Sequence, residues 1–250
     1  MQRNLKRALG RLMPNGFYFS RRGYCPCCDQ TVRFLALDSW LRDSFQCLSC
    51  GSIPRQRALM TLLERHYPAW KDLHIHESSP NRGGRLERDC KHYLASQFFP
   101  GRPLGEVFDG YRNEDLEKQT FPDSAFDLVV TQDVMEHVYD PLAAFGEIAR
   151  TLKPGGAHIL SVPLVNKHRP SEVWATKAPD GSPVFAGEAE FHGNPVDPRG
   201  SPVTMHWGFD IVEIIARSGL TTTVEHLDDL QLGIRAEYIE ILVCRKPVPQ

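Results

Sequence analysis

Short apolar runs alternate with helical patterns along the chain from residue 54 onward. A helix is predicted to begin at Pro54, because the leucines at positions 59, 62 and 63 share one face. Strands are predicted where apolar runs are bounded by turn residues, at 73–76, 93–96, 126–131, 157–163 and 237–244. Strands that alternate with helices favour an open, mostly parallel α/β sheet with helices on both faces.

Two further helices carry start and stop signals. Asp140 is the expected N-cap of a helix with Pro141 at its first position, and Lys153-Pro-Gly-Gly156 is expected to end that helix. A second helix is predicted after residue 209, where Asp210 and Glu213 have the spacing of a capping box.

Four of the seven cysteines form two close pairs ahead of the α/β region. Cys25 and Cys28 give C-x2-C, and after eighteen residues Cys47 and Cys50 give a second C-x2-C. Four thiolates at this spacing are typical of a structural zinc site of the zinc-ribbon type, because no coordination position is left open for water. Cys27 is an alternative to Cys28 as a ligand. Ordinary buried cysteines or a redox pair fit two such pairs less well.

Charge is unevenly spread, although the net charge is only −2. Residues 1–72 carry 12 Lys and Arg against 5 Asp and Glu, whereas the remainder carries 17 against 26. This split favours an anionic partner, such as RNA or a phosphorylated molecule, at the N-terminal part. No run approaches the roughly 18 apolar residues of a membrane span. The leucines at positions 5, 9 and 12 predict a short surface helix that basic residues interrupt, so we expect a soluble, cytoplasmic protein.

One stretch of the sequence resembles a known family. The run from Phe121 to Val138 holds an F-x-D-x-x-F-D pattern and then Glu136-His137, and Leu152-Lys-Pro-Gly-Gly156 follows. This closely resembles class I S-adenosylmethionine-dependent methyltransferases of the type 11 group. The resemblance extends in element order over about residues 70–245. It implies a Rossmann-like class I methyltransferase sheet that binds S-adenosylmethionine across the carboxyl ends of its strands.

The resemblance also implies roles for several residues. Asp115 would accept a hydrogen bond from the adenine amino group, and the backbone of Leu116 would contact the edge of the ring. Gln132 and Asp133 would lie beside the methionine portion of the cofactor.

The glycine loop departs from the family pattern. His76, Glu77 and Ser78 stand where the first glycines are expected, and glycine returns at Gly83. Gln97 stands where the family has an acidic residue for the ribose hydroxyls, and an amide makes a weaker hydrogen bond to a diol. Glu77 is a candidate to supply a carboxylate to the ribose or to the ammonium group of the cofactor.

The long connection between the last two helical regions is rich in proline and glycine. Residues 164–207 show no periodic pattern but carry several aromatic and histidine residues, so we expect a folded lid on the substrate side. Methyl transfer requires alignment of nucleophile, methyl carbon and sulfur, and some acceptors also need a base. His137 and His192 are the candidates for that base. A buried structural role is an equally good interpretation of His137.

Together these features predict a zinc ribbon over residues 1–53 and a methyltransferase domain over 54–250 that contains the insertion 164–207. The predicted activity is methyl transfer to an O or N atom of a small or sugar-like acceptor. An RNA methyltransferase that uses the basic N-terminal region is one alternative. A non-catalytic module with a degenerate cofactor site is another.

Overall fold

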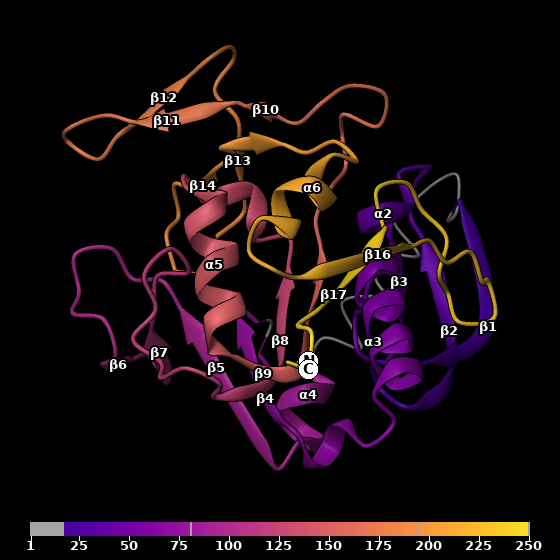
Figure 1. Cartoon of the computed structure of the whole chain (residues 1–250). Coiled ribbons are helices and arrows are strands. Elements are labelled where there is room, and N and C mark those ends of the chain that lie inside the picture. The colour runs from indigo at the N-terminus through magenta and orange to yellow at the C-terminus, as the bar shows by residue number, and fades with distance from the viewer. Residues whose placement is uncertain (1–17, 81, 195, 250) are drawn as a thin grey trace. The chain divides into compact units, whose positions relative to one another are not determined.

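The computed structural model describes residues 18–80, 82–194 and 196–249. The helix predicted near residues 5–12 lies outside the described residues. Contacts divide the chain into two compact units. The first runs to Leu62 and includes Leu227–Ile239, and the second comprises Leu63–His226 and the chain from Glu240 onward. The elements of each unit are labelled in Figure 1. The domain boundary at residue 53 stays a prediction.

The first unit is built on a three-stranded antiparallel sheet in the order β1-β2-β3. Its elements are β1 (Phe19–Cys25), β2 (Gln30–Ala36), α2 (Leu41–Ser44), β3 (Phe45–Cys47) and the first part of α3 (Pro54–His66). The strand β2 lies between the two cysteine pairs. The phenylalanines at 34 and 45 are fully buried and pack edge to face beside the cysteines.

The segment Leu227–Ile239 belongs to the first unit, although the 164 residues of Leu63–His226 separate it from the rest of that unit. Tyr24 donates its backbone N–H to the carbonyl of Gln231 at 2.8 Å. Gly233 has a φ of 67°, and a Cβ there would lie 2.8 Å from the ring of Phe34. Only glycine fits both the backbone angle and the close approach.

An eight-stranded sheet forms the second unit, in the order β16-β17-β9-β8-β4-β5-β7-β6. The strands are β4 (His74–Ser78), β5 (His92–Gln97), β6 (Val107–Phe108), β7 (Tyr111–Asn113), β8 (Phe126–Gln132), β9 (Leu152–Ser161), β16 (Thr221–Glu225) and β17 (Ile241–Arg245). The five strands from β7 to β9 run parallel, whereas β17 is antiparallel to both of its neighbours and β6 to β7. The predicted, mostly parallel α/β sheet is confirmed.

Helical elements of the second unit are short apart from α5. They are η1 (Trp70–Asp72), α4 (Arg85–Asp89), η2 (Met135–His137), α5 (Pro141–Thr151) and α6 (Ile211–Ala216), together with the end of α3. The Asp140 cap of α5 is confirmed, because its carboxylate accepts the N–H of Ala143 at 3.0 Å. The capping box at Asp210 is wrong. That carboxylate instead accepts the N–H and hydroxyl of Ser171, at 2.8 and 2.7 Å. Because it bonds to the insertion, it does not cap α6.

Two strand boundaries differ from the sequence prediction. The Lys153-Pro-Gly-Gly156 run lies inside β9, which starts directly after α5 at Leu152. The last strand starts at Ile241, not at residue 237, because residues up to Ile239 pack in the first unit.

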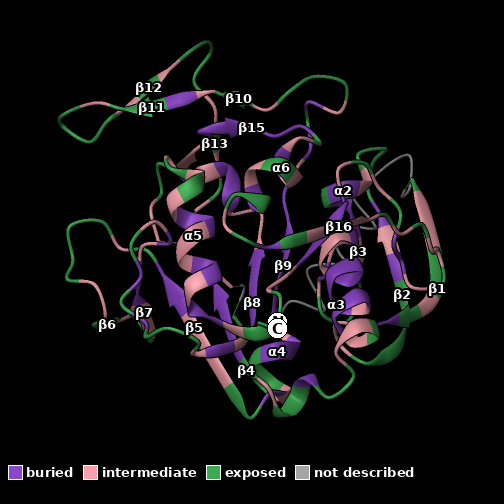
Figure 2. Cartoon of the chain, in the orientation of Figure 1, coloured by how far each residue is buried: buried purple, intermediate pink, exposed green. Residues whose placement is uncertain are grey.

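Both faces of the eight-stranded sheet are buried. Val129 and Leu160 lie on one face, in an apolar cluster with Phe145 of α5 and Ile211 of α6. Figure 2 shows the buried residues of these central strands in purple.

The opposite face carries Ile75 and Leu128, which have no exposed surface. The end of α3 lies on this face, because His66 bonds to Glu225 of β16 and to Arg245 of β17. The register places both partners on the same face as Ile75. Helices therefore cover both faces, as predicted.

The insertion at 164–207 is folded into three two-stranded antiparallel sheets, labelled in Figures 1 and 2. They pair β10 (Glu172–Val173) with β15 (Met205–His206), β11 (Ala175–Lys177) with β12 (Pro183–Phe185), and β13 (Phe191–His192) with β14 (Ser201–Pro202). The Trp174 ring stacks on His206 with centroids 4.4 Å apart, and its indole N–H donates to the carbonyl of Glu188. Within the described residues, no helix has the length and apolar character of a membrane span.

Candidate functional site

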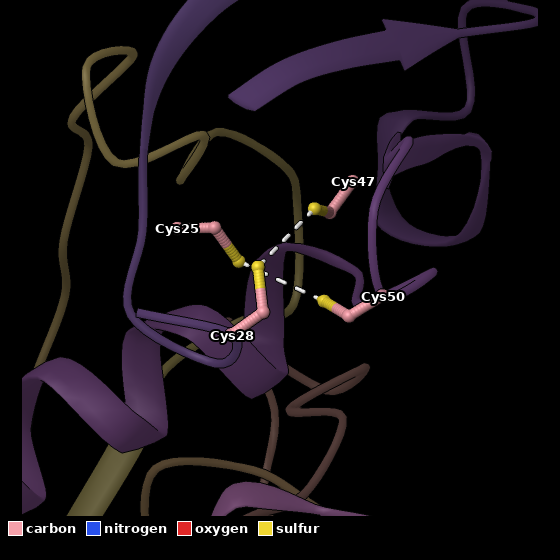
Figure 3. A group of neighbouring side chains, drawn as sticks. All are labelled: Cys25, Cys28, Cys47 and Cys50. Carbon is pink, nitrogen blue, oxygen red and sulfur yellow. Dashed lines mark hydrogen bonds between the residues drawn. The ribbon is translucent and has the colours of Figure 1, made fainter. Parts of the chain in front are cut away.

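The four predicted cysteine ligands meet in the first unit. Two turns bring them there, because each C-x2-C pair follows the end of a strand, β1 or β3. The Sγ atoms of Cys25 and Cys50 are 3.8 Å apart, and those of Cys28 and Cys47 are 3.9 Å apart (Figure 3). All four sulfurs lie within 4.8 Å of one another. A tetrahedral zinc site with Zn–S bonds of about 2.3 Å has sulfur–sulfur edges of about 3.8 Å. The cluster fits that geometry, and Cys27 is not part of it.

The charges around this cluster also suit a dication. Burial and the charge on Cys25 raise the pKa of the Cys28 thiol to about 12, since four thiols this close cannot all ionise without a cation. Arg57 of α3 is fully buried nearby. Its guanidinium donates to the carbonyls of Phe45 at 2.7 Å and of Gly233 at 2.6 Å, as well as to that of Ser52.

A second group of polar residues lies at the carboxyl end of the central strands. Glu77 is the penultimate residue of β4, before Ser78, and Gln132 ends the neighbouring β8. Gln132 donates its amide to Glu77 Oε1 at 3.0 Å, and the Tyr93 hydroxyl donates to Glu77 Oε2 at 3.0 Å. The amide oxygen of the same side chain, Gln132 Oε1, is buried and has no hydrogen-bond partner among the described residues. Burial raises the pKa of Glu77 to about 7, and its two hydrogen bonds oppose that shift.

The two loops that follow these strands adopt left-handed backbone conformations. Ser79 has a φ of 54° and Asp133 has a φ of 52°. This region favours glycine, and an L-residue there is held by surrounding contacts. The N–H of Ser79 donates to Ser96 O at 2.8 Å, and Asp133 accepts the hydroxyl of Ser161 at 2.9 Å. Ser79 therefore turns as a glycine would, in the loop where the sequence lacks the expected glycines.

The residues predicted to contact adenine and ribose lie at or after the carboxyl ends of β5 and β7, at the same edge of the sheet. Gln97 ends β5 and is buried. Asp115 lies two residues beyond β7, half-buried, and accepts the N–H of Glu117 at 2.9 Å. Leu116 packs in the apolar cluster. Gly83 has a φ of 74°, and its N–H donates to Glu87. The structure thus brings residues from β4, β5, β7 and β8 to one edge, and their roles in cofactor binding stay predictions.

His76 is placed differently from the other candidates. Its side chain has no exposed surface, bonds to Ser96 Oγ at 2.7 Å and lies against the rings of Phe121 and Phe126. Burial lowers its pKa to about 3, so the imidazole is neutral. It is packed in the interior of the sheet face that α5 and α6 cover.

The two base candidates lie together. His137 is in η2, four residues after Asp133, and His192 is in β13 of the insertion. Their rings are 5.0 Å apart, edge to face. Glu136 lies between them with 1% of its surface exposed. Its Oε1 is 3.9 Å from His137 Nε2 and 3.7 Å from His192 Nδ1. Contact with Glu136 raises the pKa of His192. Burial opposes this shift, and the charge of Glu190 adds a smaller increase.

Sequence reasoning missed two members of these groups. The sequence places Tyr93 in a strand and Glu136 in the Glu-His motif, but it assigns neither residue a role in the site. The insertion holds the motif in place, because Thr204 donates its N–H to Glu136 O at 2.7 Å. The spacing of the motif was a usable signal, since its glutamate lies in the same short helical turn as a candidate base.

Comparison with known proteins agrees with this arrangement. A family model described as "Methyltransferase domain" matches residues 93–160. An S-adenosylmethionine-dependent methyltransferase from Mesorhizobium loti superposes with a TM-score of 0.50 at 19% identity, over 76% of this chain and 98% of the other. A putative one from Listeria monocytogenes gives 0.50 at 12% identity, over 77% and 98%. The α/β body has the class I methyltransferase fold.

Sequence relatives match a narrower region of this methyltransferase fold. An uncharacterized methyltransferase of Schizosaccharomyces pombe is 46% identical over 46 residues, 18% of this chain and 16% of the relative. Phosphoethanolamine N-methyltransferase 1 of Zea mays is 34% identical over 62 residues, 25% of this chain and 12% of the relative. The matches thus span less than a fifth of each relative's length.

Proposed function

We propose that the chain is an S-adenosylmethionine-dependent methyltransferase whose cofactor lies across the carboxyl ends of β4, β5, β7 and β8. The observation that carries the proposal is the Glu77–Gln132 pair. It offers a buried carboxylate and a buried, unpartnered amide oxygen at the adjoining ends of two parallel strands. A buried acceptor without a donor is costly, and the ammonium group of the cofactor supplies donors.

The remaining cofactor contacts follow from the same edge. Gln97 faces the ribose, the carboxylate of Asp115 accepts from the adenine amino group, and Asp133 flanks the methionine portion. Binding in this crevice is general for open parallel α/β sheets. His76 is left out of this set, since its side chain is enclosed in the sheet interior.

The acceptor lies between the end of β8 and the insertion. His137 Nδ1 is 2.8 Å from the carbonyl of Pro202, which only accepts, so Nδ1 carries the hydrogen and Nε2 has the lone pair. An acceptor O or N atom beside this nitrogen or His192 has a proton acceptor at hand. Ordered two-stranded sheets around the site favour a small or sugar-like acceptor. The maize relative is named for such a substrate, the small molecule phosphoethanolamine.

The cysteine cluster binds one structural zinc ion in this proposal. Cys25, Cys28, Cys47 and Cys50 would supply all four ligands, so the ion holds the turns of the ribbon together and has no position for a substrate. The sulfur–sulfur distances support this assignment.

RNA is a second candidate acceptor, favoured by one feature of the ribbon. Arg22 and Arg33 are directly opposite each other on β1 and β2, beside Arg21. All three are exposed, and none has an ion-pair partner within the described part of the chain. Like charges opposite each other destabilise a hairpin, whereas a phosphate would neutralise them.

Salt dependence separates the two acceptor classes. If RNA binds the arginine hairpin, its affinity falls steeply as salt rises, with a log–log slope of about 0.9 or 0.7 per phosphate contacted for duplex or single strands. Filter binding with structured RNA measures the slope. A flat slope, or no binding at low salt, leaves the small acceptor.

Calorimetry tests the proposed function itself. Titration with S-adenosylmethionine and with S-adenosylhomocysteine should show one site per chain, while NAD, which other Rossmann-like sheets bind, should show none. If neither cofactor form binds at millimolar concentration, the chain is a non-catalytic module with this fold.

A further inference from the structure

The carboxylate of Glu136 is the most exceptional polar group of the second unit. It follows β8 directly, in η2, with 1% of its surface exposed. Neither Oε1 nor Oε2 has a hydrogen-bond partner among the residues that the structure describes. A buried carboxylate costs several kcal/mol unless a positive charge neutralises it, so the group calls for a nearby cation.

Two imidazoles face this carboxylate. His137 Nε2 and His192 Nδ1 are 3.9 and 3.7 Å from Glu136 Oε1. One ligand atom from each of the three residues lies within 4.8 Å of the others. Tetrahedral ligand bonds of about 2.0–2.1 Å need edges of about 3.4 Å, so the two carboxylate–imidazole distances exceed such an edge by about 0.5 and 0.3 Å.

Both imidazoles are oriented by an acceptor on their far side. His137 Nδ1 donates to Pro202 O at 2.8 Å. His192 Nε2 is 3.4 Å from Glu190 Oε1, and Glu190 Oε2 is 2.9 Å from His206 Nε2. An imidazole that gives its far N–H to a carbonyl or carboxylate presents a lone pair on the near nitrogen, which is the arrangement of metal-ligating histidines. Two lone pairs and a carboxylate therefore converge on one point.

We propose that Glu136, His137 and His192 bind one divalent cation of the first-row transition series, such as Mn²⁺, Fe²⁺ or Zn²⁺. Two imidazoles and one carboxylate form a ligand set that suits these ions and leaves coordination positions open for water or an acceptor oxygen. The four-thiolate cluster, in contrast, is soft and closed, so an oxygen-preferring ion such as Mn²⁺ distinguishes the two sites.

The use of this ion in catalysis rests on the proposed function, and it replaces the base role of His137 and His192, because their lone pairs then hold the ion. Glu136 lies three residues after Asp133, beside the proposed methionine end of the cofactor. A hydroxyl bound to the ion loses its proton to solvent more readily, because the cation stabilises the alkoxide. The alkoxide lone pair then forms the O–CH₃ bond as the S–CH₃ bond breaks, and neutral S-adenosylhomocysteine leaves. The site thus favours oxygen as the acceptor atom.

Electron paramagnetic resonance of Mn²⁺ tests the binding site without any turnover. Full-length protein adjusted to one zinc ion per chain, which the soft four-thiolate cluster takes first, should remove about one equivalent of Mn²⁺ from the free-ion signal. Glu136→Gln and His192→Gln should each abolish that binding. Glu188→Gln and His168→Gln are the matched controls, since both residues lie exposed in the same insertion, and they should bind as wild type does.

Two results would overturn the proposal: wild-type protein that leaves the Mn²⁺ signal unchanged, or variants that bind as tightly as wild type. The first is expected if a protonated His192 alone neutralises Glu136. His137→Gln, with circular dichroism to verify folding, replaces any variant that fails to fold. Failure of the proposed function gives a different result. Protein that binds Mn²⁺ but neither form of the cofactor would support the ion site and contradict the methyltransferase activity.

Discussion

The cysteine cluster and the carboxyl edge of the large sheet are assembled in opposite ways. The cluster takes its four sulfurs from two tight sequence pairs, 25–28 and 47–50, within one small antiparallel unit. The edge takes its polar groups from the ends of four parallel strands between residues 77 and 133. The four sulfurs of the first set lie within 4.8 Å of one another, while the second leaves Gln132 Oε1 and the Glu136 oxygens without hydrogen-bond partners among the described residues.

This contrast separates a site built for stability from one built for a ligand. A closed ligand set stabilises a unit too small to bury much apolar surface. An open set keeps buried acceptors ready for a ligand, at a cost in stability that the surrounding sheet must offset. The two regions should therefore respond differently to mutation, and the following predictions test that difference.

The largest expected effect is the loss of one zinc ligand. Cys50→Ser should lower zinc from about one ion per chain to a small fraction and unfold the ribbon, since structural zinc contributes about 10–16 kcal/mol in isolated zinc fingers. Elemental analysis and hydrogen exchange of residues 19–47 measure this. Cys27→Ser, a substitution outside the cluster, should keep its zinc. Zinc-free wild-type protein, purified under reducing conditions without chelator, would refute the site.

Arg57 offers the next largest effect, also confined to the first unit. Arg57→Met removes the guanidinium donor from three buried carbonyls. Within the described residues, only the Ser52 carbonyl among them also accepts a backbone N–H, from Cys47. We therefore expect a destabilisation of about 3–5 kcal/mol. Arg55→Met on the same helix removes an ion pair to the exposed Asp43 and should cost less than about 1 kcal/mol. Urea denaturation compares the two variants, and equal losses would argue against a special role for Arg57.

The sequence predicted the parts of this molecule whose signals are local. The Asp140 cap, the strand at 126–131 and the cysteine pairs each depend on residues a few positions apart, and the structure places them as expected. Contacts between distant segments left no such pattern. The packing of Leu227–Ile239 in the first unit and the transfer of the Asp210 carboxylate to Ser171 are examples.

The candidate site shows the same division. Sequence motifs pointed to His137 and to Gln132-Asp133, which lie at the carboxyl edge. They did not reveal that the Glu136 carboxylate is buried without a hydrogen-bond partner among the described residues, because its surroundings include His192 and Thr204 of the insertion. Likewise His76 sits in the glycine loop by sequence, yet the alternation along β4 turns its side chain into the sheet interior.

A pH-dependent effect is expected at Glu77. Its pKa is about 7 in the folded chain and 4.5 ordinarily, so the folded state binds the proton more tightly than the unfolded state. The stability from this proton is complete below pH 4.5 and is lost as the pH rises through 7. Glu77→Gln should therefore gain about 3 kcal/mol relative to wild type between acid and pH 8. Urea denaturation at both pH values measures the gain, and a pH-independent difference would contradict it.

Cofactor binding by an Asp115 variant tests the central claim most directly. Asp115→Ala removes a half-buried carboxylate from the edge without touching the apolar core, so the melting temperature should be nearly unchanged. Its affinity for S-adenosylhomocysteine in calorimetry should fall by about 1–3 kcal/mol, the cost of deleting a charged hydrogen-bond partner. Asp180→Ala, an exposed aspartate of the insertion, serves as the control with wild-type affinity. Equal binding by Asp115→Ala and wild type, or no binding by either, would contradict a cofactor site at the carboxyl edge.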